Sequence, residues 1–129
     1  MSPINDFLIL FMHYFDQLSV VTEELFYKIL QARHLIAIGG ADAEQFTPGF
    51  LHITTGMATS WVELHNNLQL LTPNQLLFMH NQPGFTQLYT LFYDIEPIIN
   101  EPLPANWYIQ NEANTLYTEN MWKLAEIGL

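Results

Sequence analysis

Histidines are the first side chains to consider for chemistry, because the chain has five of them and no cysteine. They are His13, His34, His52, His65 and His80. His13 and Asp16 are three residues apart and would share a helix face, whereas Glu63 and His65 are two apart and would not. Neither an HExxH nor an ExxH pattern occurs, and a zinc site without thiolates needs His and carboxylate ligands that converge. We therefore predict that the protein binds no metal and no cofactor.

Motifs for nucleophilic or acid–base catalysis are also lacking in the sequence. The serines are Ser2, Ser19 and Ser60, and none lies in a G-x-S-x-G turn. Glu23 and Glu24 are neighbouring carboxylates, but they lie in the first turn of a predicted helix, where negative charge is favourable without any catalytic role. Gly39–Gly40 lacks the G-x-G-x-x-G pattern of a phosphate loop. The prediction is that the protein is not an enzyme. The alternative is an enzyme or a small-ligand binder with an apolar pocket between helices.

The charge balance is the strongest indication of function. Thirteen acidic residues face only Lys28, Arg33 and Lys123, which gives a net charge of −10. Proteins bind nucleic acids and anionic membranes largely through Lys and Arg, so we predict neither as a partner. A basic protein partner would be attracted, and this attraction chiefly raises the association rate. The alternative explanation is that negative charge keeps the protein soluble.

Aromatic residues are the other resource, with nine Phe, six Tyr and three Trp. The stretch NWYIQNEANTLYTENMWKL places four large rings among Asn, Gln and Glu residues. Trp and Tyr are enriched at binding hot spots because they bury a large area at little entropic cost. The predicted partner-binding residues are Trp107, Tyr108, Glu112, Tyr117, Glu119 and Trp122. The alternative is a packed C-terminal helix with an aromatic rim.

The N-terminal stretch NDFLILFMHYFDQL predicts a helix over residues 2–18. Ser2 can cap this helix and Pro3 suits its first position. Apolar residues follow with helical spacing at Ile4, Phe7, Leu8, Phe11, Phe15 and Leu18. Further apolar residues surround most of the helix, so we expect it to be central to the fold or half covered by a partner. One such partner is a second copy of the chain, in a homodimer.

The same stretch is neither an export signal nor a membrane span in our interpretation. It has no positively charged segment and no small-residue cleavage site, and His13 and Asp16 interrupt its apolar run. We therefore expect a cytoplasmic protein.

The rest of the chain also predicts mostly helices. Ser19 or Thr22 would cap a second helix that ends at Gly39–Gly40. Further helices are predicted over residues 56–71, from Thr72–Pro73 to His80, over 85–95 and over 112–127. Three prolines predict an extended connection over residues 97–106.

Together these features predict a mainly α fold, a single-domain bundle of five to six short helices over residues 1–129. The alternative is an α+β fold with a small sheet from HLIAI, FLHIT and WYIQ. The predicted function is non-catalytic protein binding, by an acidic protein of the immunity, antitoxin or inhibitor type that covers a basic partner. A small assembly chaperone or adaptor is the alternative within the same class.

Overall fold

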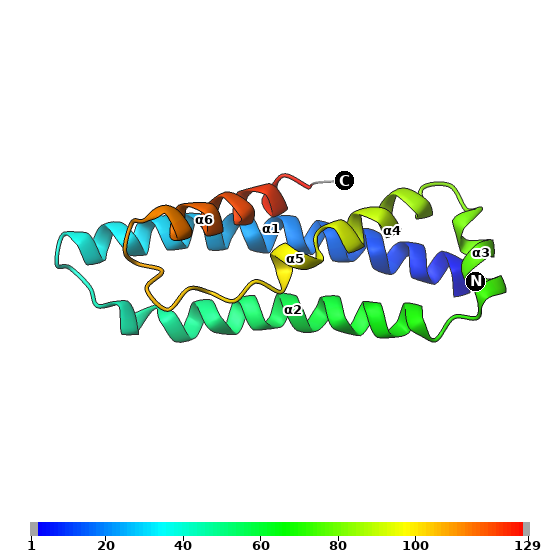
Figure 1. Cartoon of the computed structure of the whole chain (residues 1–129), viewed down its shortest axis with the longest axis horizontal. Coiled ribbons are helices and arrows are strands. Elements are labelled where there is room, and N and C mark those ends of the chain that lie inside the picture. The colour runs from blue at the N-terminus through cyan, green and yellow to red at the C-terminus, as the bar shows by residue number, and fades with distance from the viewer. Residues whose placement is uncertain (1–2, 128–129) are drawn as a thin grey trace.

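Two long helices extend along the molecule (Figure 1). Helix α1 (Pro3–Ala37) runs in one direction, and α2 (Thr47–Gln69) returns antiparallel to it after a short 3-10 helix, η1 (Ala43–Gln45). The structure is a computed structural model that describes residues 3–127. Gly39 ends α1 with a φ of 76°, the left-handed conformation that a helix-terminating glycine adopts readily.

Shorter helices cover one side of this pair. Helix α3 (Pro73–His80) lies at the end of the molecule near the start of α1, and α4 (Phe85–Asp94) runs back beside the first half of α1. After the single turn of α5 (Glu96–Ile99), residues 100–111 form an irregular connection. Helix α6 (Glu112–Ala125) then packs antiparallel against the second half of α1, which is its main partner.

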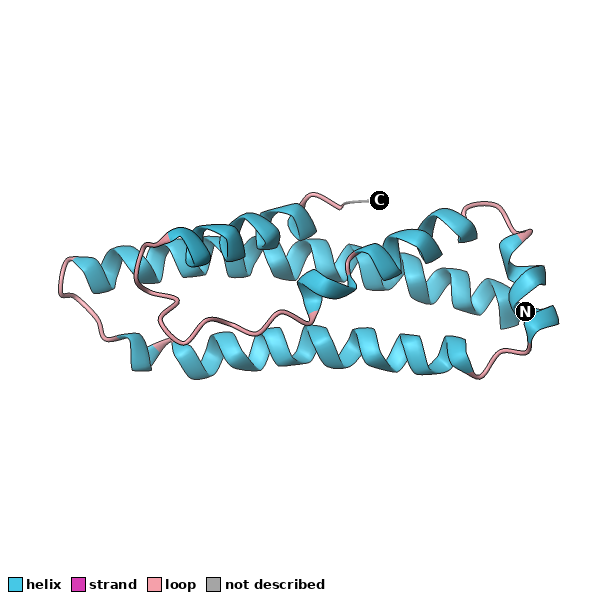
Figure 2. Ribbon diagram, in the orientation of Figure 1, coloured by secondary structure: helices cyan, strands magenta, loops and turns pink. Residues whose placement is uncertain are grey.

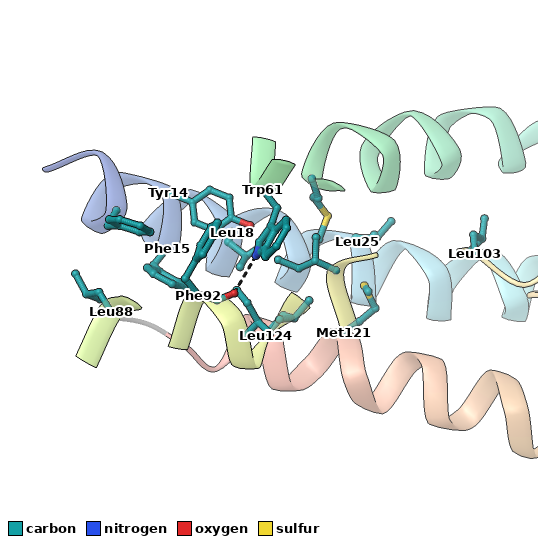
Figure 3. Close-up of a cluster of buried hydrophobic side chains, with 14 of the residues drawn as sticks. Tyr14, Phe15, Leu18, Leu25, Trp61, Leu88, Phe92, Leu103, Met121 and Leu124 are labelled. Carbon is teal, nitrogen blue, oxygen red and sulfur yellow. Dashed lines mark hydrogen bonds between the residues drawn. The ribbon is translucent and has the colours of Figure 1, made fainter. Parts of the chain in front are cut away.

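The core between these helices is rich in aromatic rings (Figure 3). Phe11 and Phe15 on α1 are completely buried, and the edge of one ring of the Phe11–Phe92 pair meets the face of the other at 5.2 Å between centroids. Trp61 on α2 stacks on Phe92 at 4.7 Å, and its indole N–H donates to the Phe92 carbonyl oxygen at 2.9 Å. Helix α1 is therefore central to the fold, which is one of the two placements that the sequence predicts.

The mainly α prediction is confirmed. Residues 3–127 are 77% helical, with six α-helices and no strand (Figure 2). The sheet alternative is wrong, because HLIAI ends α1, FLHITT lies inside α2, and WYIQ forms turns before α6. Residues Phe50, Met57, Trp61 and Leu68 make one buried helical face across α2, and this packing outweighs the local β propensity of Ile and Thr.

The predicted bundle of short helices is wrong in one respect, because α1 is a single helix of 35 residues. Thr22 does not start a second helix: its hydroxyl donates to the Leu18 carbonyl oxygen, one turn back, at 2.7 Å. The Ser19 hydroxyl instead donates to the Ala125 carbonyl oxygen on α6 at 2.6 Å. Both hydroxyls are thus satisfied inside a continuous helix. The predicted cap at Ser2 lies outside the described residues.

Other helix boundaries follow local signals more closely. Thr72 caps α3 as predicted, in a capping box with Gln75. The predicted connection over 97–106 is wrong at its start, because Pro97 lies in the first turn of α5, where a missing N–H does no harm. Helix α2 begins at Thr47 rather than at residue 56, so Gly56 lies within it. Helix α6 begins at the predicted residue and ends at Ala125.

Candidate protein-binding surface

The outer face of α6 carries a row of carboxylates. Glu112, Glu119 and Glu126 follow one another at intervals of seven residues, so they lie along one line of the helix surface, and all three are exposed. We call these three residues the acidic row. Lys123 is exposed one turn after Glu119 and is the only Lys or Arg of α6.

Arg33 fixes the start of α6 against α1. Its Nε donates to the Trp107 carbonyl oxygen at 2.8 Å, and its Nη2 donates to the Asn114 carbonyl oxygen at 3.3 Å. Burial lowers the pKa of this guanidinium from its ordinary value, yet an arginine stays charged in a folded protein. Arg33 is therefore engaged inside the fold, and Lys28 and Lys123 are the two exposed cationic side chains among Lys and Arg.

Asn114 organises the backbone that precedes the acidic row. Its backbone N–H donates to Oδ1 of Asn111, which caps α6, at 2.9 Å. Its completely buried side-chain amide donates to the carbonyl oxygens of Asn106 and Ile109. The Asn-rich sequence here therefore has a structural role, since Asn114 donates to two carbonyl groups of the irregular connection that precedes α6.

An aromatic patch lies where α6 meets α1. The Trp122 ring lies 5.0 Å from Phe26 and 6.0 Å from Tyr27, between centroids. Trp122 and Phe26 are half-buried, whereas Tyr27 is 54% exposed. We call these three residues the aromatic patch. The sequence predicted Trp122 as a binding residue but not Phe26 or Tyr27. Helical spacing could have identified Tyr27, because it lies on the face of α1 opposite the buried Leu25 and Ile29.

Trp107 and Tyr117, two of the residues predicted to bind a partner, do not belong to this surface, because both side chains are buried in the core. Each is only 1% exposed. The Trp107 ring packs on Phe50 at 5.0 Å, and its indole N–H donates to the Thr47 hydroxyl at 2.8 Å, so it joins the connection to the start of α2. Tyr117 faces the core, where burial and, to a smaller extent, the charge of Glu101 raise the pKa of its hydroxyl.

Tyr108 is half-buried beside Trp107, with 5.9 Å between ring centroids. It lines a cavity of about 630 Å³ together with Asp42 and Glu44 around η1. The structure therefore places Tyr108 at the end of the molecule where α1 turns into η1, next to exposed carboxylates. Glu112, Glu119 and Trp122 are the predicted residues that α6 brings onto one outer surface.

Two of the five histidines, His65 and His80, contact neighbouring polar and aromatic side chains. His65 Nδ1 lies 3.0 Å from the Tyr93 hydroxyl, and its ring stacks on Trp61 at 5.1 Å. His80 Nδ1 lies 3.0 Å from the Thr86 hydroxyl. Residues 3–127 contain no group of three or more His, Asp or Glu side chains placed to hold a metal ion.

The chain also has shallow apolar grooves on both flanks of α2. One, of about 360 Å³, lies between α1 and α2, and another, of about 390 Å³, lies between α2 and residues 99–103. Within the described part of the chain, no helix has the length and apolar character that a membrane span requires.

The fold and this surface define an elongated helical bundle with acidic and aromatic side chains on its C-terminal helix. Comparison of the chain with protein-family models, with curated proteins and with solved structures finds no match.

Proposed function

We propose that the protein is a non-catalytic binding protein whose acidic surface covers a basic protein partner, as immunity proteins, antitoxins and enzyme inhibitors do. The observation that carries this proposal is the distribution of charge. Every acidic side chain except the half-buried Glu101 is exposed, whereas Arg33 is held by two backbone carbonyl groups. The surface therefore keeps nearly all of its negative charge and offers few cations to neutralise it.

The acidic row and the aromatic patch supply the two components that such an interface needs. Exposed carboxylates steer a positively charged partner and raise the rate of encounter. Trp and Tyr side chains supply the buried anchors that dominate affinity. Trp122 lies on α6 beside the acidic row, and Tyr27 extends the aromatic area onto α1. We place the centre of the interface at this α1–α6 junction.

A charge-reversal experiment tests the proposal. We expect wild-type protein, used as bait in an extract of its native source at about 0.15 M salt, to retain a basic protein. The variant Glu112→Lys with Glu119→Lys should lose it. The matched control is Glu44→Lys with Glu63→Lys, which changes the net charge equally at exposed positions of η1 and α2 and should retain it. Equal retention by both variants, or retention of acidic proteins only, would contradict the proposal.

An assembly chaperone or adaptor would use the same surface, so a second measurement separates the two roles. An inhibitor or immunity protein should abolish the activity of its purified partner at a ratio of one to one. A chaperone or adaptor should leave that activity unchanged and should be released when its partner assembles with other subunits.

We also propose that α1 is the surface for self-association. Its outer face exposes Ile9, Met12 and Val20, which are apolar side chains without cover in the monomer. Sedimentation velocity should detect a dimer whose population rises with concentration, and Val20→Lys should abolish it. A wild-type protein that stays monomeric at about 1 mM would contradict this proposal.

A further inference from the structure

An exposed stripe of side chains runs along the outer face of α1. Its members follow one another in alternating steps of four and three residues, so they lie along one side of the helix. The members, all exposed, are Asp16, Val20, Glu23, Tyr27, Leu30 and His34. We call these residues the α1 stripe. The buried Leu18, Leu25 and Ala32 recur every seven residues on the opposite side of the helix, so the stripe faces away from the rest of the bundle.

Half of the α1 stripe consists of large apolar or aromatic side chains. Val20 is 56% exposed, Tyr27 is 54% exposed and Leu30 is 40% exposed. Burial of such side chains against another helix is favourable, and a helix that packs along a stripe of this spacing contacts every member of it. The three other members are two carboxylates and an imidazole, so they determine which helix fits.

The order of side chains along the α1 stripe is complementary to its own reversal. A second α1 can be laid antiparallel to the first, with the two-fold axis at the level of residue 25. Apolar side chains then meet apolar ones, and each carboxylate meets an imidazole or a phenol that can donate a hydrogen bond to it. The pairs, each formed twice, are Val20 with Leu30, Asp16 with His34, and Glu23 with Tyr27. A two-fold interface between identical chains requires this self-complementarity.

Other arrangements of two α1 helices are less complementary. A parallel pair in register would place Asp16 on Asp16 and Glu23 on Glu23, and like charges repel. A shift of the antiparallel pair by one heptad places Val20 against the charged Glu23. The opposite shift places Val20 against Ala37 and leaves Asp16 beyond the end of the second helix, so it shortens the contact. The register with Val20 against Leu30 pairs all members of the α1 stripe with one another.

We propose that two copies of this chain associate through the α1 stripe as an antiparallel pair, with Val20 of each copy against Leu30 of the other. This inference rests on the self-association proposed for α1 and adds its direction and its register. Because Tyr27 also belongs to the aromatic patch, the dimer covers part of the α1–α6 junction. Self-association and binding of a basic partner would therefore compete for Tyr27.

Disulfide cross-linking tests the direction and the register, because the sequence contains no cysteine of its own. Val20→Cys and Leu30→Cys are purified in reduced form and oxidised separately or as an equimolar mixture. We expect a disulfide-linked dimer on a non-reducing gel from the mixture and little from either variant alone, because a disulfide needs Cα atoms within about 7 Å. Asp16→Cys mixed with His34→Cys should give the same result at a second level of the pair.

Matched mixtures report the other arrangements. Val20→Cys with Glu23→Cys and Val20→Cys with Ala37→Cys correspond to the two shifted registers, and a parallel pair would cross-link each single variant with itself. All of these should give little dimer. More cross-linking in any of them than between Val20→Cys and Leu30→Cys would overturn the proposed pairing while self-association stands. Wild-type protein that sediments only as a monomer would overturn both.

Discussion

Arg33 on α1 donates a hydrogen bond to the carbonyl oxygen of Trp107, 74 residues later in the chain, at 2.8 Å. The same guanidinium donates to the Asn114 carbonyl oxygen, so one side chain holds both the connection and the first turn of α6. Because the Trp107 ring is buried against the start of α2, this hydrogen bond links three elements that are far apart in sequence.

Replacing Arg33 should therefore destabilise the whole bundle. We expect Arg33→Ala to lower the free energy of unfolding by about 2–3 kcal/mol, because two carbonyl groups lose a charged donor. Urea denaturation followed by circular dichroism measures this change. Lys28 is an exposed cation on the same helix, so Lys28→Ala should change the free energy of unfolding by less than about 0.5 kcal/mol. An Arg33→Ala protein as stable as the wild type would show that water replaces the guanidinium without loss.

The central position of α1 gives a second prediction. Phe11→Ala and Phe15→Ala should each lower the free energy of unfolding by about 3–5 kcal/mol, because each removes a completely buried ring. Leu10→Ala removes an apolar side chain that is exposed on the same helix, away from the proposed self-association face, and serves as the control. Thermal melts measure the unfolding temperature of each variant. Equal unfolding temperatures for all three variants would contradict this packing.

Two buried tyrosines predict a loss of stability at high pH. Burial raises the pKa of Tyr14 and of Tyr117 above the ordinary value near 10. The unfolded chain then loses these protons first, so their contribution is fully present below about pH 10 and is lost as the pH rises further. Each tyrosine should lower the free energy of unfolding by about 1.4 kcal/mol per pH unit in that range.

Urea titrations at about pH 9 and pH 11 measure this slope. A double variant with Tyr14→Phe and Tyr117→Phe should lose less stability between these pH values than the wild type. Identical losses would assign the alkaline effect to other groups.

The aromatic patch predicts how a partner would dissociate. Once a partner is identified, Trp122→Ala should weaken binding by about 2 kcal/mol, mainly through faster dissociation, as expected for a hot-spot ring. Reversal of the acidic row should instead slow association and reduce its dependence on salt, because exposed charges are screened over about 8 Å at physiological ionic strength. Surface plasmon resonance at two salt concentrations separates these effects. A Trp122→Ala variant with unchanged dissociation would move the interface away from the α1–α6 junction.

Local signals predicted some parts of this fold well. Thr72 and Pro73 predicted the start of α3 correctly, because a cap and a proline at the first helical position act within a few residues.

Contacts between distant residues could not be predicted in the same way. Serine often caps helices, which is why the sequence predicts a cap at Ser19. Its hydrogen bond to the Ala125 carbonyl oxygen can form only because α6 packs against α1. Trp107 stands among polar residues, yet it enters the core because Thr47 and Phe50 provide a hydrogen-bond acceptor and an apolar surface. The sequence predicted only Trp122 of the aromatic patch for the same reason, because Phe26 and Tyr27 lie almost a hundred residues earlier in the chain.

The packing of α6 against α1 also determines when the apolar face of α1 can be covered during synthesis. Helix α1, with the apolar face of Leu25 and Ile29, is synthesised before α6, the helix that packs against its second half. Until then the growing chain keeps this apolar face uncovered, because the Ser19–Ala125 bond closes a loop of more than a hundred residues. We therefore expect a chain truncated before α6 to expose this apolar face and to aggregate.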